Sequence, residues 1–420
     1  TGDSTAMIRI QRASNHYWQR PDQEWATLDS TATSLTGADW HLQFERRAGH
    51  WTGAVWAGEI TSAVEVNDLG FNTDAERLAS GLRVAWQEVR PTRYFRNSKV
   101  ELTASTDFSH EMLRDSWSLD GLQYGQTGGS ARLSTNVEFL NFWTAQASLS
   151  YGADLMSRSA TRGGPRMVDP GSWGGTLGFG TDNRKVLFVQ PRFSITRGRQ
   201  GSGNRLGVNM SMTLQPSTRL LMTFTPRYDR SSSGAQYVST TDALPFDPTF
   251  GARYLFGELD RTDLSMVARV NWTFTPRLSL EFYAQPLVSA VEYDSYKQLL
   301  EPETFAFDRF SEGTATGTGD ELRCVGGRTC EDSGHRRYID FDGNGVVDYA
   351  FTDRDFNLRS FRATSVLRWE YIPGSTVFLV WQRRQAEKVP AGDFDVGRDM
   401  EALFGLPAVS YTHLRAHETT

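Results

Sequence analysis

Alternation of apolar and polar residues constrains the fold of this chain more than any other feature of its sequence. From residue 205 to residue 214, every second side chain is apolar: Leu206, Val208, Met210, Met212 and Leu214. Successive side chains of a β-strand point to opposite faces, so a period of two gathers the apolar side chains on one face. The pattern returns along most of the chain and predicts an all-β, antiparallel fold with about fifteen strands.

The clearest strands come in pairs around tight turns. They are Ala131–Phe139 with Trp143–Tyr151, Leu264–Phe274 with Leu278–Val288, and Phe361–Tyr371 with Thr376–Gln382. Further strands are expected near residues 5–12, 38–46, 51–61, 79–89, 98–109, 173–183, 186–197 and 218–230. Three prolines fall inside strand patterns: Pro191, Pro226 and Pro286. Because proline cannot donate a hydrogen bond to a sheet, these three are expected at bulges or strand ends.

The connections between the expected strands alternate between short and long. Short ones lie near residues 47–50, 90–97, 140–142, 183–186, 215–218, 275–277 and 372–375, and long ones lie near 12–37, 62–78, 110–127, 156–172, 231–251 and 294–356. Transmembrane β-barrels of bacterial outer membranes have short turns at one end and long loops at the other. The alternative is a soluble all-β protein with one wet face, which has no reason to sort its connections in this way.

The composition agrees with a membrane barrel. Hydrophobic residues make up 39% of the chain and the mean hydropathy is −0.47. The sequence has no run of about 18 apolar residues that could form a transmembrane helix. A membrane barrel needs no such run, because each of its strands alternates apolar residues with polar ones. Trp143, Trp272 and Trp369 stand beside short turns, where an interfacial aromatic belt would lie. We therefore predict a transmembrane β-barrel in the outer membrane of a Gram-negative bacterium, with the lipid bilayer as its partner.

Charged residues of both signs are expected on the polar face of the strands, toward a water-filled lumen. They are Lys99, Glu101, Arg132, Glu138, Arg192, Arg205, Arg269, Glu281, Arg362, Arg368 and Glu370. Opposite charges on neighbouring strands can form cross-strand pairs. We favour an ordinary solvated network over a selectivity-setting pore lining. The formal net charge of −6 gives no basic footprint, so nucleic acid is not expected as a partner.

The strongest local motif is D-F-D-G-N-G-V-V-D, from Asp340 to Asp348. It matches the first nine positions of a calcium loop, in which oxygens at alternate positions converge on one cation. The residues expected to supply those oxygens are Asp340, Asp342, Asn344, Val346 through its backbone carbonyl, and Asp348.

Position twelve of this motif is Phe351 instead of the glutamate of an EF-hand, so Asp353 or Asp355 would have to substitute. No flanking helices are evident, and the pattern is closer to the calcium loops of dockerin or thrombospondin type 3 repeats. It predicts a weak structural calcium site in loop 340–353. The alternative is a polar loop without metal.

The two cysteines, Cys324 and Cys330, lie six residues apart in a glycine-rich loop. In an exported protein, a disulfide between them is favoured over two free thiols. A zinc site would need further ligands, and only His335 is near.

Several segments resemble an uncharacterised family of bacterial outer-membrane barrels. They are VEVNDLGF at 64–71, TPRLSL at 275–280 running on to YAQP at 283–286, and LRWEY at 367–371 followed by PGST at 373–376, with RGGP at 162–165 as a weaker match. Full-length members of that family pair an N-terminal β-sandwich, similar to a family 9 carbohydrate-binding module, with a C-terminal barrel. The resemblance implies an outer-membrane barrel whose N-terminal domain is missing from this chain. It transfers no catalytic residue.

Both ends of the sequence lead us to expect a fragment. Residues 1–3 have neither the basic nor the apolar region of a signal peptide. Residues 409–420 look like translated sequencing-adapter read-through, so we assign residues 1–408 to the barrel, truncated at both ends, and 409–420 to a non-native tail. The complete barrel would have sixteen or more strands, since such barrels have an even number, and this chain would leave an unpaired edge. His413 and His417 have the i, i+4 spacing of a helical metal pair, an interpretation that we do not favour.

The leading function is passage or surface capture of a solute, and the family resemblance suggests a glycan. The alternatives are a calcium-braced surface adhesion or structural protein and, third, an outer-membrane hydrolase. No G-x-S-x-G nucleophile motif, phosphate-binding glycine loop or cofactor motif is present. Asp107 and His110, near the end of an expected strand, are the only pair that could be named as catalytic, so catalysis is not expected.

Overall fold

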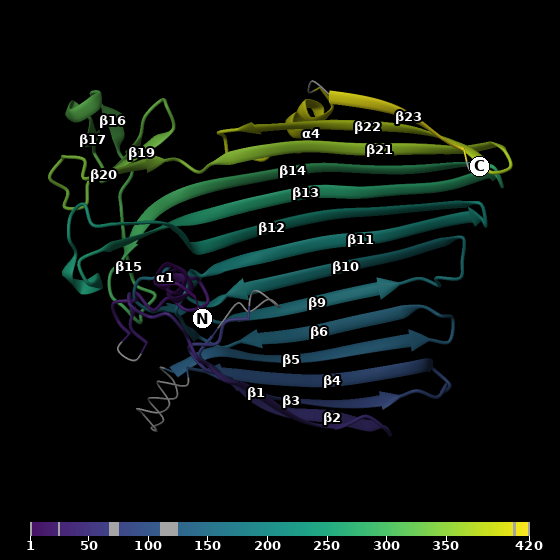
Figure 1. Ribbon diagram of the computed structural model, residues 1–420, viewed down its shortest axis with the longest axis horizontal. Coiled ribbons are helices and arrows are strands. Elements are labelled where there is room, and N and C mark those ends of the chain that lie inside the picture. The colour runs from purple at the N-terminus through teal and green to yellow at the C-terminus, as the bar shows by residue number, and fades with distance from the viewer. Residues whose placement is uncertain (1, 24–25, 67–74, 110–124, 406–408, 419–420) are drawn as a thin grey trace.

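The computed structural model describes residues 2–23, 26–66, 75–109, 125–405 and 409–418. Within them, a 16-stranded antiparallel sheet follows the order of the chain (Figure 1). Its strands are β1 (Asp39–Arg46), β2 (Trp51–Ile60), β3 (Arg77–Glu88), β4 (Phe95–Phe108), β5 (Gln126–Phe139), β6 (Thr144–Gly152), β9 (Ser172–Gly180), β10 (Leu187–Gly198), β11 (Gly203–Ser217), β12 (Leu220–Thr241), β13 (Arg253–Thr275), β14 (Leu278–Leu299), β15 (Phe307–Arg309), β21 (Phe356–Ile372), β22 (Ser375–Val389) and β23 (Val409–Glu418). The prediction of an all-β antiparallel fold is confirmed.

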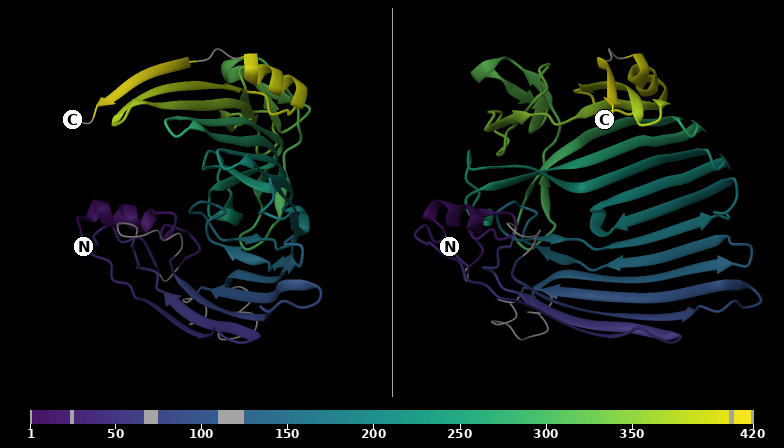
Figure 2. Two further views of the ribbon diagram at one scale, coloured as in Figure 1. Left: turned by 90° about the vertical axis from the view of Figure 1, so that its right-hand side faces the viewer. Right: turned by 45° about the vertical axis from the view of Figure 1, so that its right-hand side comes forward.

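The sheet curves into an open trough instead of closing into a barrel (Figure 2). β1 and β23 are its two edges, and no ladder joins them within the described residues. Each strand of the main path pairs with the next one along it, so closure would require pairing between β1 and β23. The sheet therefore has the unpaired edges expected for this chain, and closure of the complete barrel stays a prediction.

The connections sort by length as the sequence predicted. The short turns, such as those between β5 and β6 and between β13 and β14, lie at one end of the sheet, here called the turn end (Figure 1). The opposite end, here called the loop end, carries the long connections, including residues 300–355. The turn end and the loop end therefore lie at opposite ends of the strands.

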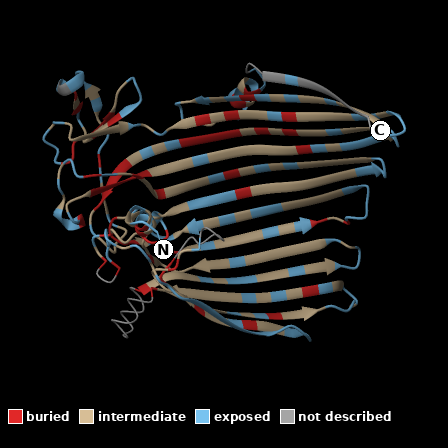
Figure 3. Ribbon diagram, in the orientation of Figure 1, coloured by how far each residue is buried: buried red, intermediate tan, exposed pale blue. Residues whose placement is uncertain are grey.

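Alternation gives the sheet one apolar and one polar face. Leu149 of β6 is aligned with Leu133 of β5 on one side and with Gly175 of β9 on the other. Leu133 and Leu149 are exposed, and so is Leu177 of β9. Figure 3 shows mostly exposed and intermediate residues along the middle of the strands, with buried residues gathered more at the loop end. The apolar face is therefore uncovered over the middle of the sheet.

Helix α4 (Val396–Gly405) identifies the apolar face as the convex one. It packs on β21, where the rings of Phe361 and Phe404 lie 5.7 Å apart. Phe361 lies an even number of residues from Leu367 and Trp369, so all three share the apolar face of β21. Figure 2 shows α4 on the outer side of the curve. The polar face is consequently the concave one.

Residues 5–12 form a helix, not the predicted strand. Helix α1 (Ser4–Arg12) begins after Asp3, whose carboxylate accepts a hydrogen bond from the backbone N–H of Ala6 at 2.7 Å. Its buried side chains, Met7 and Gln11, are four residues apart, so burial follows a helical period and the period-two pattern does not hold here. Helices in the described residues are all too short or too polar to cross a membrane.

The three prolines lie inside strands where the ladder is interrupted on one side. Pro226 is aligned with Met266 of β13 but with no residue of β11, and Pro286 is aligned with Phe361 of β21 but with no residue of β13. Pro191 pairs with β11 and not with β9. The missing proline N–H thus coincides with a gap in the ladder, as the physics of proline requires, although none of the three ends a strand.

Residues 409–418 form β23, an edge strand paired with β22, with His413 opposite Val380. An i, i+4 metal pair of His413 and His417 on a helix does not arise in this conformation. The origin of these residues as a non-native tail stays a prediction.

Candidate functional site in the loop assembly

Three strands extend far past the others at the loop end. β12, β13 and β14 have 22, 23 and 22 residues, whereas β6 and β9 have 9 each. Residues 300–355 pack on these extensions and are here called the loop assembly. It contains a hairpin of β16 (Thr314–Thr316) and β17 (Arg323–Val325), and a sheet of β18 (Thr329–Glu331), β19 (Arg336–Ile339) and β20 (Tyr349–Thr352) (Figure 1).

A hydrophobic core joins the loop assembly to the extended strands. Leu255 of β13 and Tyr296 of β14 pack with Ile339 and Phe341, and all four side chains are buried. Burial of each such side chain contributes about 1.5–3 kcal/mol. The loop assembly is therefore held by packing as well as by its covalent connections.

Cys324 of β17 and Cys330 of β18 form a disulfide, as favoured from the sequence. The two sulfurs lie in a small cluster with Leu322. Because the cysteines belong to the hairpin and to the three-stranded sheet, the bond ties these two parts of the loop assembly together.

The predicted calcium residues form the connection between β19 and β20. Carboxylate oxygens of Asp340, Asp342 and Asp348 lie within 4.8 Å of one another. Asp340 is buried, whereas Asp342 is exposed. Gly343 and Gly345 have φ values of 75° and 87°, the left-handed region that favours glycine. The structure thus brings together the three carboxylates of the predicted set, here called the acidic loop.

The other two predicted ligands lie in the same connection. The side-chain oxygen of Asn344 accepts a hydrogen bond from the backbone N–H of Val346 at 2.7 Å, and its Nδ2 donates to Asp342 at 2.9 Å. An amide oxygen has two lone pairs, so this contact leaves Asn344 able to bind a cation. The side chain of Val346 is exposed.

The negative charge of the acidic loop is opposed by backbone N–H groups, by the side-chain amide of Asn344 and, without an ion pair, by the charge of Arg253. Asp340 accepts hydrogen bonds from the backbone N–H groups of Gly343 at 2.7 Å and Gly345 at 2.6 Å. Arg328 donates to the backbone carbonyl of Asp340 at 3.3 Å, but its ion pair is with Asp308. In the part of the chain that the structure describes, no lysine or arginine forms an ion pair with the three aspartates. Such an arrangement favours a bound cation.

The residues that follow the acidic loop do not complete it. Phe351 packs against the ring of Tyr296, with centroids 5.2 Å apart. Asp353 pairs with Arg337 at 2.9 Å, and Asp355 accepts a hydrogen bond from a backbone N–H of β14 at 2.8 Å. Since both carboxylates are held by other partners, neither takes the place of the twelfth ligand.

Arg337 is the centre of a separate charge cluster. It pairs with Glu312 at 2.6 Å, Glu331 at 3.0 Å and Asp353 at 2.9 Å, and it is almost completely buried. Burial and the neighbouring Asp353 carboxylate raise the pKa of Asp355 to about 7. The loop assembly therefore contains one well-compensated carboxylate and, beside it, one carboxyl group that resists ionisation.

No pattern in the sequence indicates this cluster. The three carboxylates that meet Arg337 come from residues 312, 331 and 353. They have no fixed spacing, and only the folded strands bring them to one arginine.

The concave face carries the charges predicted to line a lumen. Arg205 pairs with Asp229 at 2.8 Å, and Arg132 of β5 donates to Ser148 of β6 at 2.9 Å. Both are cross-strand contacts between polar-face residues. The register keeps the other predicted charges on this face: Lys99, Glu101, Glu138, Arg192, Arg269, Glu281, Arg362, Arg368 and Glu370.

The pair of Asp107 and His110 lies partly outside the described residues. Asp107 lies at the loop end of β4, opposite Gly128 of β5. His110 lies outside the described residues, so only one member of the pair has a described position.

A family model described as "Domain of unknown function (DUF5916)" matches residues 3–313 of the chain. The chain belongs to this family. The match spans α1 and the strands from β1 to β15, and it ends before the acidic loop. Three of the segments that suggested an outer-membrane family, at 64–71, 162–165 and 275–286, fall inside it, and the segment at 367–376 falls outside. The link to a carbohydrate-binding module stays a prediction.

None of the curated proteins matches the chain. Among solved structures, the crystal structure of the siderophore receptor PirA from Acinetobacter baumannii has 10% sequence identity and a TM-score of 0.28, over 91% of this chain and 71% of that one. The function has to be argued from the geometry of the chain itself.

Proposed function

We propose that this chain forms the wall of a β-barrel in the outer membrane of a Gram-negative bacterium, where a solute passes or is captured. The main support for the membrane location is a pair of aromatic contacts. Trp143 meets Phe179 at the turn end with ring centroids 5.0 Å apart, and Tyr151 meets Trp173 toward the loop end at 4.6 Å. Tyr151 lies eight residues after Trp143 (151 − 143 = 8). Counted inclusively, the nine residues from Trp143 to Tyr151 match the roughly 9–11 residues of a tilted membrane-spanning strand, with an aromatic girdle at each end.

The surface between the two aromatic contacts is apolar and exposed. Leu149 is 66% exposed and Leu177 is 64% exposed, and none of the described segments forms a layer that covers them. Removing apolar surface from water is worth about 25 cal/mol per Å². A lipid environment supplies that burial to the whole convex face, whereas water would leave it as one continuous apolar patch.

The concave face supports passage or capture of a polar solute. Its charged and hydroxyl side chains pair across strands and leave room for water, as in the polar lumen of outer-membrane barrels. A glycan is the first solute class to test, because the family resemblance links such barrels to a carbohydrate-binding module.

Heat-modifiable gel mobility tests the proposed barrel. Expressed from its full natural gene and purified from membranes in detergent, the protein is expected to migrate faster before boiling than after it, because a closed barrel resists dodecyl sulfate until heated. A protein that is soluble without detergent and shows no shift would overturn the membrane location and leave a secreted all-β binding protein.

A second function is supported by the acidic loop: a structural calcium site that braces the loop assembly for surface adhesion. Its donors are carboxylate and amide oxygens, which suit Ca²⁺, and the incomplete set suits weak binding, with Kd of about 10⁻⁴–10⁻³ M. When bound, the ion would be held by Asp340, Asp342 and Asp348, and it would supply charge neutralisation and no chemistry.

Calcium titration by calorimetry checks this site. Binding heat is expected from the unmodified protein and a loss of affinity of at least tenfold from Asp342→Asn, since Asp342 is exposed and its substitution spares the buried contacts of Asp340. The matched control is Glu301→Gln, which removes the same charge from the same assembly outside the acidic loop. Equal affinities for the two variants would argue against the site.

A further inference from the structure

We propose that the convex face of the sheet binds an anionic phospholipid in preference to a zwitterionic one, with its acyl chain in an apolar hollow across β5, β6, β9 and β10 and its phosphate on Arg197 and Arg230. This proposal rests on the membrane location proposed above, and it names a specific ligand on the lipid side of the wall.

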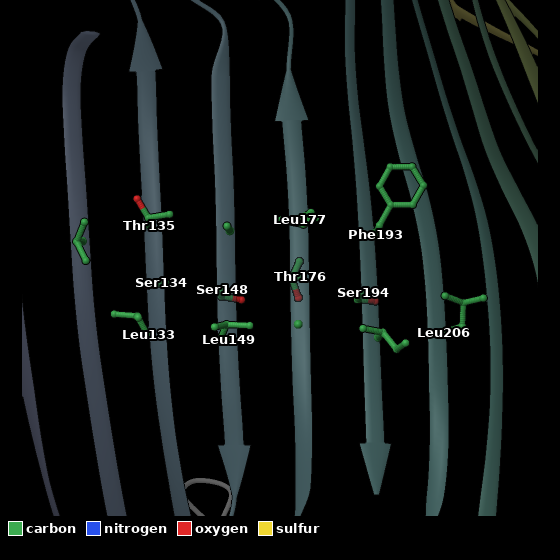
Figure 4. Close-up of a pocket in the computed structure, with 14 residues that line it drawn as sticks. Leu133, Ser134, Thr135, Ser148, Leu149, Thr176, Leu177, Phe193, Ser194 and Leu206 are labelled. Carbon is green, nitrogen blue, oxygen red and sulfur yellow. The ribbon is translucent and has the colours of Figure 1, made fainter. Parts of the chain in front are cut away.

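The hollow has a volume of about 860 Å³. Its apolar lining includes Leu133, Leu149, Leu177, Phe193 and Leu206. Figure 4 shows these side chains distributed over neighbouring strands. Small-molecule sites occupy roughly 300–1,000 Å³, so the hollow is large enough for part of a lipid chain.

A glycine leaves the centre of the hollow empty. Gly175 is aligned between Leu149 and Ile195, on the apolar face. A Cβ built on Gly175 would have its nearest neighbour, a methyl group of Ile195, at 3.8 Å. The backbone therefore tolerates a side chain at this position, and the absence of one creates space without being required by packing.

A polar recess of about 480 Å³ continues the hollow toward the loop end. It shares Ile195 and Leu206 with the hollow, and its lining includes Arg197 and Arg230. The register places Arg197 opposite Trp173 and Arg230 opposite Leu206, so both arginines belong to the convex face. One amphipathic ligand could therefore contact both the hollow and the recess.

The two guanidinium groups have little internal compensation. Arg197 is exposed and forms no ion pair within the ranges that the structure describes. Arg230 lies 4.0 Å from Asp260, and the side chains are 65% and 44% exposed, which makes a long, solvated pair. Arginine binds phosphate oxygens bidentately, so two such groups at one recess complement a phosphate.

The positions of Arg197 and Arg230 along their strands match the depth at which a lipid headgroup lies in the membrane. Arg197 lies ten residues after Leu187, the first residue of β10, and Arg230 lies ten residues after Leu220, the first residue of β12 (197 − 187 = 10; 230 − 220 = 10). A membrane-spanning strand has about 9–11 residues. Both arginines thus lie at the outer boundary of the apolar band, beside Trp173 of the aromatic girdle, while Gly175 and Leu149 lie at acyl depth.

Native mass spectrometry of the detergent-solubilised protein with equimolar dioleoylphosphatidylglycerol and dioleoylphosphatidylcholine tests the proposal. Each arginine near an anionic lipid contributes about 1 kcal/mol of binding free energy. The two arginines together are therefore expected to give the anionic lipid a preference of roughly ten- to thirtyfold. Arg197→Gln with Arg230→Gln is expected to abolish the preference. The control, Arg132→Gln with Arg192→Gln, removes two concave-face arginines from β5 and β10 and is expected to keep the preference.

A second variant tests the acyl site separately. Gly175→Leu is expected to fill the hollow and reduce retention of phosphatidylglycerol at least fivefold, whereas Ala145→Leu, nearer the turn end of β6, is expected to have no effect. Equal binding of the two lipids, or equal loss in both arginine pairs, would overturn the lipid site. A heat-modifiable protein that shows no lipid preference refutes only this inference, whereas a protein that never enters the membrane refutes the barrel as well.

Discussion

Leu133→Arg is expected to destabilise the protein in a bilayer by about 2–4 kcal/mol, the cost measured for arginine on the lipid face at the membrane midplane. Leu133 lies six residues before Phe139, the last residue of β5, so it lies near the middle of a membrane-spanning length. It is aligned with Leu102 and Leu149 on the convex face and is 47% exposed. An arginine there would have only hydrocarbon around it.

The adjacent residue supplies the control. Ser134 faces the concave side and is aligned with Glu101 of β4, so Ser134→Arg adds the same charge beside an opposite one in water. Its effect is expected to stay within about 0.5 kcal/mol, as for surface substitutions. The measurement is a urea titration of the folded fraction in vesicles, read from heat-modifiable mobility. Similar small effects at both positions would place the convex face in water and contradict the barrel.

The regular part of the fold could be predicted because its signal is local. A period of two fixes which side chains share a face, and the turns near residues 140–142 and 275–277 fix where strands reverse. The same argument failed at residues 5–12, where four apolar residues in an alternating run fit either period. The N-cap of Asp3 and the spacing of Met7 and Gln11 decide in favour of the helix.

The loop end could not be predicted in the same detail. β12, β13 and β14 run about ten residues past their expected ends, because their extensions bury side chains such as Leu255 against residues more than 80 positions away in the chain, such as Ile339. Helix α4 was also missed, although Asp395 accepts a hydrogen bond from the backbone N–H of Arg398 at 2.7 Å, as an N-cap residue does. A search for caps in the connections would have found it.

In the candidate site, too, the residues of a contiguous motif could be predicted and those brought together by the fold could not. The acidic loop is a contiguous motif, so its carboxylates could be named from the sequence, and the structure brings three of them together. The convex-face arginines and the Arg337 cluster depend on register and on contacts between distant segments. Neither Arg197 nor Arg230 has a local context that separates it from the other arginines of the strands.

Arg337→Met is expected to destabilise the loop assembly locally by about 3–5 kcal/mol, the usual cost of removing one partner from a buried ion pair. Methionine keeps much of the side-chain volume but leaves the side chain of Asp353, only 3% exposed, without its cation. Asp355, whose pKa is already raised to about 7 beside it, stays largely protonated and supplies no replacement cation. The effect is expected in hydrogen exchange of residues 329–352, which should accelerate by a hundredfold or more, since about 1.4 kcal/mol corresponds to a factor of ten.

The neighbouring Arg336→Met is the matched control, because it removes the same charge from the same strand at an exposed position. Its exchange rates are expected to change less than threefold. Adding Asp353→Asn to Arg337→Met should recover part of the protection, since it removes the buried charge that the first substitution leaves unpaired. Heat-modifiable mobility should be unchanged in all three variants, because the main sheet does not depend on this cluster. Equal exchange in Arg336→Met and Arg337→Met would show that surface electrostatics, and not a buried charge centre, holds the loop assembly on the extended strands.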